Sequence, residues 1–361
     1  MNITKIVITG GPCAGKTTAM SWIQKNFTEK GYTVLFIPET ATEFISGGVA
    51  PWTCGTNLDY QKCQMELQLK KEEMFMRAAE SMKAKKILIV CDRGAIDNKA
   101  YMTEEEFDKV LKHTGSNPVE LRDHYDAVFH LVTAAKGAEK YYTTENNTSR
   151  TEGIKKAAEL DDKLIAAWTG HPHFRVIGND SDFENKMKKL IAEISAFLGE
   201  PEPYEIERKY LIEYPDIELL ESNPSCSKVE IIQTYLKSDD NKEVRVRQRG
   251  ADGNYVYFKT TKRRLSGEKR IEIEKRLTQK EYLKLLMDAD TSMHPIRKDR
   301  YCLTYEGQYF EIDVYPFWKD KAIVEIELRD EKQEIIFPDF LKMIKEVTDD
   351  EAYKNAALAK T

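Results

Sequence analysis

Hydrophobic residues in the first two hundred positions gather in five short runs separated by amphipathic stretches. Each run is apolar at successive positions, which is typical of strands in a parallel sheet covered by helices on both faces. Alternation of such strands with helical stretches predicts an α/β fold for this half of the chain. The runs are 5–10 (KIVITG), 33–38 (TVLFIP), 86–92 (KILIVCD), 127–132 (AVFHLV) and 174–178 (FRVIG).

The pattern changes after residue 204, where hydrophobic and polar positions alternate strictly and the polar positions are nearly all charged. This alternation predicts antiparallel strands, with helices over 278–289 and 338–360. A helix predicted over 183–198 ends at Gly199, and the sequence Glu-Pro-Glu-Pro follows it. We therefore expect an α/β domain over 1–199, a linker over 200–204 and a β domain over 205–361.

A glycine-rich motif between the first strand and the first helix predicts a phosphate-binding loop. Residues 10–17, GGPCAGKT, fit G-x-x-x-x-G-K-[ST] in full and in the required strand–helix context. The backbone N–H groups would wrap the phosphates of ATP or GTP, and a threonine hydroxyl would reach Mg²⁺. The residues expected to hold the nucleotide are Gly10, Gly11, Gly15, Lys16, Thr17 and Thr18.

Further charged residues of the α/β domain stand where nucleotide chemistry would use them. Asp92 ends a buried strand, where a P-loop fold places an acid near Mg²⁺, and Arg93 follows it. Glu39 and Glu43 follow the second strand and could hold a phosphoryl acceptor as a base, while Arg150 could close over the phosphates. The alternatives are a helix cap for Asp92, a solvated acid for Glu39 and surface charge for Arg150.

The strands of the second domain carry charged stripes that are mostly of one sign. A sheet with one solvated face explains the alternation, but solvated faces usually mix signs. Acidic stripes indicate a hard divalent cation and basic stripes indicate phosphate oxygens, which a barrel would enclose together. The stripes are Glu205, Glu207 and Lys209; Arg245, Arg247 and Arg249; Tyr257 and Lys259; Glu272 and Glu274; Lys298 and Arg300; Glu311 and Asp313; Glu325 and Glu327.

The first domain resembles the P-loop nucleoside-kinase-like group, including the ribosylnicotinamide-kinase-type AAA domains of the NadR kind. This likeness rests on residues 10–17, on PETATEF (38–44) and on CDRGAID (91–97). It implies nucleotide binding, and it leaves open whether the domain is a small-molecule kinase, an NTPase or a switch. No NKxD motif is present to indicate a preference for GTP over ATP.

The second domain resembles the CYTH, or triphosphate tunnel metalloenzyme, family. Its residues 205–209 fit E-x-E-x-K, and R-x-R, E-x-E, K-x-R and E-x-E follow in order. The resemblance implies an eight-stranded antiparallel tunnel that hydrolyses tripolyphosphate or an organic triphosphate with Mg²⁺ or Mn²⁺. Some members of the family act instead as adenylyl cyclases or RNA triphosphatases.

The same resemblance implies a role for each charged position. Lys209 would position or activate the attacking water, beside Glu205 and Glu207. The implied metal ligands of the second domain are Glu205, Glu207, Glu272, Glu274, Asp313, Glu325 and Glu327. In the first domain, Thr17 would coordinate Mg²⁺. The implied phosphate ligands are Arg245, Arg247, Lys259, Lys298 and Arg300.

The net charge, the hydrophobic runs and the cysteines limit the kinds of partner and compartment that the sequence allows. A net charge of −6 argues against general nucleic-acid binding, and no apolar run approaches the ~18–20 residues of a membrane span. The first residues read as a strand, not a signal peptide, and the six cysteines form no CxxC pair, which predicts a cytoplasmic protein. The domain order resembles the fused P-loop/CYTH proteins that include the TRPL translocation defect family. That likeness keeps open a nucleotide-regulated module that binds phosphorylated lipid head groups.

Overall fold

The computed structural model of the chain describes residues 2–142, 153–200, 206–238, 242–266, 269–328 and 333–360. For residues 141, 206, 263–266 and 269–273 it describes the backbone alone. The chain divides into two compact units, Met1–Ile194 and Ser195–Thr361. Arg150, Glu205 and the expected linker positions 201–204 lie outside the described residues, as does the side chain of Glu272.

The first unit contains a parallel sheet of five strands in the order β2-β3-β1-β4-β5. All five apolar runs form strands, as their patterns predict: β1 (Asn2–Thr9), β2 (Thr33–Ile37), β3 (Lys86–Asp92), β4 (Ala127–Leu131) and β5 (Phe174–Ile177). The central strands are buried on both faces, which explains why they are apolar at successive positions.

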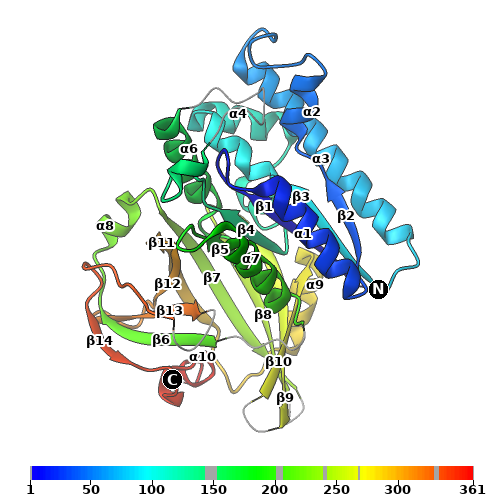
Figure 1. Ribbon diagram of the computed structural model, residues 1–361. Helices are drawn as coiled ribbons and strands as arrows, with labels where there is room; N and C mark the ends of the chain where they lie inside the picture. Colours follow the sequence, from blue (N-terminus) through cyan, green and yellow to red (C-terminus); the bar gives the residue numbers. More distant parts are fainter. Residues whose placement is uncertain are drawn as a thin grey trace. The chain divides into compact units, whose positions relative to one another are not determined.

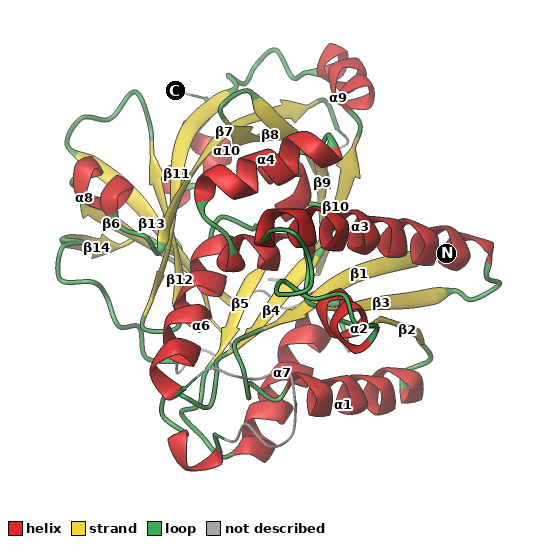
Figure 2. Cartoon of the chain, turned by 90° about the horizontal axis from the view of Figure 1, so that it is seen from above, coloured by secondary structure: helices red, strands yellow, loops and turns green. Residues whose placement is uncertain are grey.

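Helices cover both faces of this sheet. Figure 2 shows α1 (Lys16–Glu29) and α7 (Phe183–Phe197) along one face and α3 (Asn57–Ser81) along the other. The remaining helices are α2 (Thr40–Ser46), α4 (Glu104–Thr114), α5 (Pro118–Arg122) and α6 (Ile154–Trp168), with 3₁₀ turns at Ala95–Tyr101 and Glu139–Tyr141. The arrangement brings the segments that follow β1, β2 and β3 to one edge of the sheet, because parallel strands all end on the same side.

The second unit contains an antiparallel sheet of nine strands in the order β10-β9-β8-β7-β11-β12-β13-β6-β14 (Figure 1). The antiparallel fold predicted from the alternation is confirmed. Eight strands are seven or more residues long and match the eight implied: β6 (Ile206–Glu213), β7 (Cys226–Leu236), β8 (Lys242–Ala251), β9 (Asn254–Ser266), β10 (Lys269–Leu277), β11 (Ile296–Tyr305), β12 (Gln308–Val314) and β13 (Lys321–Leu328). The ninth, β14 (Met343–Glu346), adds a short edge, and in the described residues β10 does not pair with β14 or β6 to close the ladder.

Two helical predictions for this unit have different outcomes. The helix expected over 278–289 is confirmed as α9 (Gln279–Leu285) with a 3₁₀ turn at Leu286–Asp288. The helix expected over 338–360 is wrong: the segment forms β14, a 3₁₀ turn at Glu351–Tyr353 and the short α10 (Asn355–Leu358). Residues 343–346 pair with the exposed backbone of β6, which gives them hydrogen bonds that a helix would have supplied locally. The short α8 (Ile217–Ser222) precedes β7.

The two faces of the second sheet are sorted by polarity. On one face Tyr210, Ile212, Leu303 and Phe310 form an apolar core together with Leu220 of α8. The opposite face carries the charged stripes, and at one end it turns apolar where Leu211, Ile323 and Tyr315 pack against Leu358 of α10. The C-terminal helix therefore packs on the apolar end of the charged face. In neither unit is any described helix both long and apolar enough to cross a membrane.

Candidate functional site

The loop between β1 and α1 has the backbone of a phosphate cradle. Gly10 and Gly15 adopt φ of +144° and +95°, and a Cβ on Gly10 would lie 2.1 Å from Leu131 O, so both positions require glycine. Lys16 Nζ lies 3.3 Å from Gly10 O, folded back over its own loop. Thr17 and Thr18 begin α1 and are exposed. The loop and the first turn of α1 thus hold together the six residues that the sequence predicts to bind a nucleotide.

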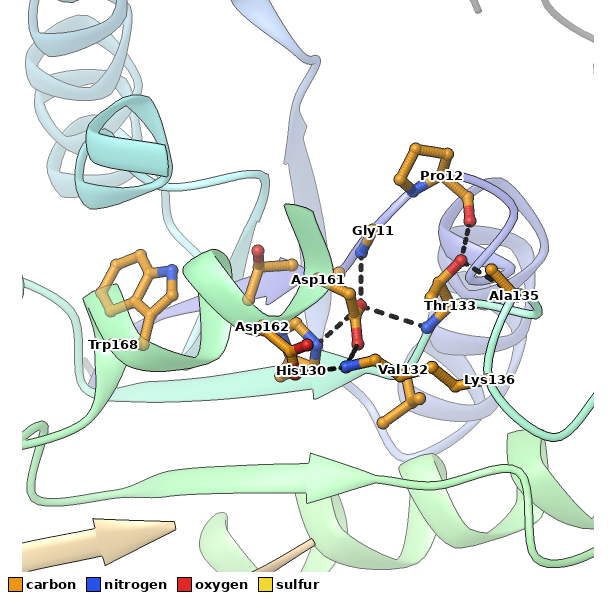
Figure 3. Close-up of polar contacts among 12 residues, drawn as sticks. Gly11, Pro12, His130, Val132, Thr133, Ala135, Lys136, Asp161, Asp162 and Trp168 are labelled. Atoms are coloured by element: carbon orange, nitrogen blue, oxygen red, sulfur yellow. Dashed lines mark hydrogen bonds and ion pairs between the residues drawn. The ribbon is translucent and has the colours of Figure 1, made fainter. Parts of the chain in front are cut away.

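A buried carboxylate, that of Asp161 in α6, holds the backbone of this loop at Gly11 (Figure 3). Its Oδ1 accepts hydrogen bonds from Gly11 N at 2.9 Å and from Thr133 N at 3.1 Å, and it lies 3.0 Å from His130 Nε2. Lys136 Nζ lies 3.1 Å from Oδ2. Burial opposes ionisation, but His130, Lys136 and the Gly11 amide hold the pKa of Asp161 well below its usual value. Asp161 therefore joins three segments of the unit through one charge.

Charged side chains meet beside Lys16 at the ends of β2 and β3. Arg93 Nε donates to Glu39 Oε1 at 2.5 Å, and Arg93 adopts φ of +70°, which is unusual for a residue other than glycine. Burial opposes ionisation of Glu39, but Arg93 and Lys16 hold its pKa down to about 2. Burial also raises the pKa of Asp92, against the opposing effect of Lys16. The structure thus brings Glu39, Asp92 and Arg93 to the lysine of the phosphate loop.

Three buried polar atoms in this cluster have no hydrogen-bond partner among the described residues: Asp92 Oδ1, Arg93 Nη1 and Tyr60 Oη. Tyr60 belongs to the cluster because burial and then the charge of Glu39 raise its pKa to about 12. Arg93 Nη1 does lie 3.9 Å from Asp97 Oδ1, an ion pair without a hydrogen bond. Buried polar groups are normally hydrogen-bonded, so atoms without such a partner in a charged cluster indicate a place where a polar ligand binds. Glu43 instead points to Lys71, at 2.6 Å.

The second unit contains a buried network of charges centred on Arg300. Its Nε and Nη2 donate to the two oxygens of Asp313 at 2.6 and 2.7 Å, and Nη2 also donates to Glu325 Oε2 at 2.6 Å. Glu325 Oε1 in turn accepts from Lys209 Nζ at 2.5 Å. Further ion pairs join Lys298 to Asp313 and Arg300 to Glu311. This network contains five of the residues with a role predicted from the sequence, together with Glu311, which stood in a charged stripe without a role of its own.

The sheet is curved strongly enough to bring distant strands together. Burial and the charge of Glu325 raise the pKa of Glu207, on β6, to about 7, while Lys209 and then Lys262 of β9 oppose this. In a flat sheet β6 and β9 would be six strand spacings apart, roughly 29 Å. An electrostatic contact between their side chains therefore requires a concave charged face, as a tunnel has.

Arginines from β8 form the other side of this face. Arg247 makes an ion pair with Glu274, which also accepts from Thr260 Oγ1 at 2.9 Å, and Arg245 hydrogen-bonds Tyr235. Arg247 Nε is buried without a hydrogen-bond partner in the described residues. The structure does not bring Lys259 to this group. Lys259 pairs across the sheet with Val246 and Lys275 and so lies on the opposite face.

The charged stripes pair with one another to a degree that the sequence did not reveal. Glu325 and Asp313 are each held by two cations, and Glu327 stands opposite Glu207 in the neighbouring strand. Within the described ranges, no three acidic, histidine or cysteine side chains are placed to hold a metal ion. Glu207 and Glu325 nevertheless offer neighbouring carboxylates, and burial, followed by the like charge of Glu325, raises the pKa of Glu207. This donor chemistry fits a hard divalent cation.

Several residues of these sites carry no recognisable signal in the sequence. Asp161 lies 150 positions from Gly11, and Lys262 stands where the alternation gives no reason to prefer it over Lys259. Tyr60 lies within a long helix and reads as core. Asp97 is the exception: it ends the CDRGAID segment, and its Oδ2 accepts from Gly94 N at 2.6 Å.

Comparisons with known proteins match the two units separately. The family profile described as AAA domain matches residues 5–186, and the profile described as CYTH domain matches residues 203–354. An inorganic triphosphatase of Nitrosomonas europaea is 35% identical over 161 residues, which cover 43% of this chain and 96% of that protein. No comparison bears on the resemblance to the TRPL translocation defect family.

Solved structures also match part of the chain. A structure described as an inorganic triphosphatase is 33% identical to this chain. The match covers 44% of this chain and 95% of the chain in that structure, with a TM-score of 0.30. A protein of Pyrococcus horikoshii OT3 is 19% identical and covers 34% of this chain and 78% of its own, with a TM-score of 0.26.

Proposed function

Because the chain belongs to the AAA domain family over residues 5–186 and to the CYTH domain family over residues 203–354, we propose that it is a metal-dependent triphosphate hydrolase with a nucleotide-binding first unit. The substrate of the second unit is tripolyphosphate or an organic triphosphate. The first unit binds ATP or GTP with Mg²⁺ in the loop of residues 10–17. The observation that carries the proposal is the buried network of Arg300, Asp313, Glu325 and Lys209 on a concave face.

Each side chain of the network has a task in this chemistry. Arg245, Arg247, Lys298 and Arg300 bind phosphate oxygens, with Lys262 on the same face in the position expected of Lys259. Lys209, held by Glu325 and 3.4 Å from Glu207, orients the attacking water. Mg²⁺ or Mn²⁺ would neutralise phosphoryl oxygens, with Glu207 and Glu325 as ligands, joined by Glu205 and Glu327. Before substrate binds, the carboxylates of Asp313 and Glu325 keep the Lys and Arg side chains in position. The negative charge of a bound triphosphate would then replace these carboxylates as the partner of the basic side chains.

The test compares two aspartates from neighbouring strands. Asp313→Asn removes a charge from the buried network, whereas Asp299→Asn removes one from an exposed pair with Lys228 at 2.8 Å. Phosphate release from tripolyphosphate, thiamine triphosphate, ATP and GTP is measured with Mg²⁺ and with Mn²⁺. The expected result is loss of turnover in D313N, retention in D299N, and no turnover after chelation of the metal.

Binding without turnover would contradict the hydrolase. A wild-type chain that binds tripolyphosphate tightly, but releases no phosphate from any of the four substrates, would favour the nucleotide-regulated phospholigand-binding module. Titration with short-chain phosphorylated lipid head groups would then test the ligand of that module.

A second candidate activity belongs to the first unit: phosphoryl transfer from its nucleotide to a small hydroxylated acceptor. Three buried atoms without a hydrogen-bond partner in the described residues favour it: Asp92 Oδ1, Arg93 Nη1 and Tyr60 Oη. Asp92 and Arg93 lie beside Lys16, which would hold the γ-phosphate, and Tyr60 lies beside Glu39. A pKa of about 2 makes Glu39 a weak base, so it would act mainly by accepting a hydrogen bond from the acceptor hydroxyl.

The kinase candidate is tested with a panel of nucleosides and ribosides. Nucleotide consumption should rise with the right acceptor, and Glu39→Gln should remove that rise, while Glu43→Gln, whose carboxylate is paired to Lys71, should not. A panel that yields no phosphorylated product above the water background would leave the first unit as an NTPase or switch.

A further inference from the structure

An exposed phenylalanine lies directly on the phosphate loop. A Cβ placed on Gly15 would lie 2.6 Å from Cε2 and 2.9 Å from Cζ of Phe183, so the ring rests against the glycine. Phe183, the first residue of α7, is nevertheless 46% exposed. A large apolar ring that contacts a binding loop and stays half exposed is not explained by core packing.

The topology of the sheet places this ring opposite the γ-phosphate end of a bound nucleotide. In a phosphate loop of this type the backbone amides hold the α- and β-phosphates, while the lysine reaches the β- and γ-phosphates. Lys16 lies beside Arg93, Asp92 and Glu39, which stand at the ends of β3 and β2 on one side of β1. Phe183 follows β5, on the other side of β1. The nucleoside end must leave the loop away from the Lys16 cluster, and Phe183 stands on that side.

The segment that carries the ring is held rigidly to the phosphate loop. Asn179 Nδ2 donates to Thr133 O at 2.8 Å and to Lys136 O at 2.7 Å, and Thr133 Oγ1 donates to Pro12 O. Lys186 Nζ donates to Asn179 Oδ1 at 2.7 Å. This chain of contacts runs from the phosphate loop to the residues just before and after Phe183. The ring therefore occupies a fixed position before any ligand binds, which lowers the cost of binding.

An unpaired hydroxyl lies close by in the sequence. Ser181 Oγ is buried and has no hydrogen-bond partner in the described part of the chain. It lies in the short segment between β5 and α7, two residues before Phe183. A buried hydroxyl without a partner, two residues before an exposed ring, offers two groups that a nucleoside can use: a π surface for the base and a hydrogen bond for its edge or its ribose.

We propose that Phe183 is the platform on which the nucleobase of a purine nucleoside triphosphate stacks, with Ser181 as its polar partner. The proposal rests on the proposed nucleotide binding by residues 10–17 and adds the site of the base, which the motif itself does not specify. A purine is the ligand that gains most, since its two fused rings cover more of an aromatic face than a pyrimidine does.

The test separates the base from the phosphates in the full-length chain. A fluorescent, ribose-labelled ATP is bound with Mg²⁺, and ATP, GTP, CTP and inorganic pyrophosphate are titrated as competitors. Lys16→Ala, which should abolish the signal, shows that the label reports on the phosphate loop. The variants are Phe183→Ala, Phe183→Leu, which keeps an apolar contact with Gly15 but has no π face, and Phe183→Trp, which restores one. Urea unfolding of each variant checks that the fold is intact.

We expect F183A and F183L to lower the affinity for ATP and GTP by roughly 5- to 150-fold, which is the usual contribution of one base–aromatic stack. F183W should retain the wild-type affinity. Pyrophosphate, which has no base, should bind all variants equally. Equal losses for ATP and pyrophosphate would overturn the platform, because the ring would then only support the loop, and unchanged ATP affinity in F183A would overturn it outright. A wild-type chain that binds no labelled nucleotide would instead overturn the proposed nucleotide site, and the platform with it.

Discussion

Replacing Asp161 by asparagine tests whether one buried charge holds the phosphate loop in place. The substitution keeps the size of the side chain and an oxygen that can face the same three donors, Gly11 N, Thr133 N and His130 Nε2. It removes the negative charge and leaves an amide opposite Lys136. The adjacent Asp162 offers a matched control, because it pairs with the same lysine at 2.6 Å but its side chain is 70% exposed.

The size of the effect follows from the three hydrogen bonds to Asp161. A bond to a charged group contributes about 1.5–3 kcal/mol and a neutral one about 0.5–1.5 kcal/mol, so each bond loses roughly 1 kcal/mol. The free energy of unfolding of the first unit should therefore fall by about 3 kcal/mol in D161N. In D162N only a surface ion pair is lost, and the fall should be ~0–1 kcal/mol.

Urea unfolding followed by tryptophan fluorescence measures both changes, since Trp22, Trp52 and Trp168 of the four tryptophans lie in the first unit. Nucleotide titration on the same variants should show weaker binding in D161N, because Gly11 belongs to the phosphate loop. If D161N and D162N lost the same free energy of unfolding, the buried charge would not be what fixes the loop.

The pH dependence gives an independent check on Asp161. Because its pKa is depressed in the folded chain, the carboxylate contributes stability above its unfolded pKa of ~3.9, and this contribution is lost as the pH falls towards the folded value. The advantage of the wild type over D161N should therefore be constant at neutral pH and shrink below about pH 4. If the stability advantage of the wild type over D161N grew as the pH fell, the depressed pKa of Asp161 would be contradicted.

Three further predictions address the proposed sites. Lys16→Ala should abolish calorimetric binding of ATP and GTP but leave tripolyphosphate hydrolysis by the second unit largely intact; loss of hydrolysis would show that the units are coupled. Arg247→Lys should weaken tripolyphosphate binding roughly 10-fold in steady-state kinetics without changing the metal requirement, because one point charge replaces a fork that also bonds Glu274. Fragments 1–199 and 203–361 should each unfold cooperatively by circular dichroism, and the expected boundary is wrong if neither does.

Local sequence was sufficient for most of the elements, the segment after residue 338 excepted, and for the backbone of the phosphate loop. The five parallel strands follow from apolar runs that must be buried on both faces, and residues 10–17 form the cradle because two glycines permit a backbone that other residues resist. The alternation after residue 204 likewise determined which residues of each strand share a face. These features depend on neighbours a few positions away, which a sequence displays directly.

Only the tertiary structure decided which charges meet. The stripes of one sign suggested separate ligands, but the register pairs them, as Arg300 with Asp313 and Arg247 with Glu274. Lys259 and Lys262 are three positions apart in β9 and so point to opposite faces of the sheet. Only the pairing of the strands decides that Lys262 faces the concave side and Lys259 does not. Asp161 reaches Gly11 across 150 residues, and residues 343–346 became an edge strand because β6 had backbone groups to pair. In each case the partner is distant in the chain, so the interaction energy that decides the outcome has no local trace in the sequence.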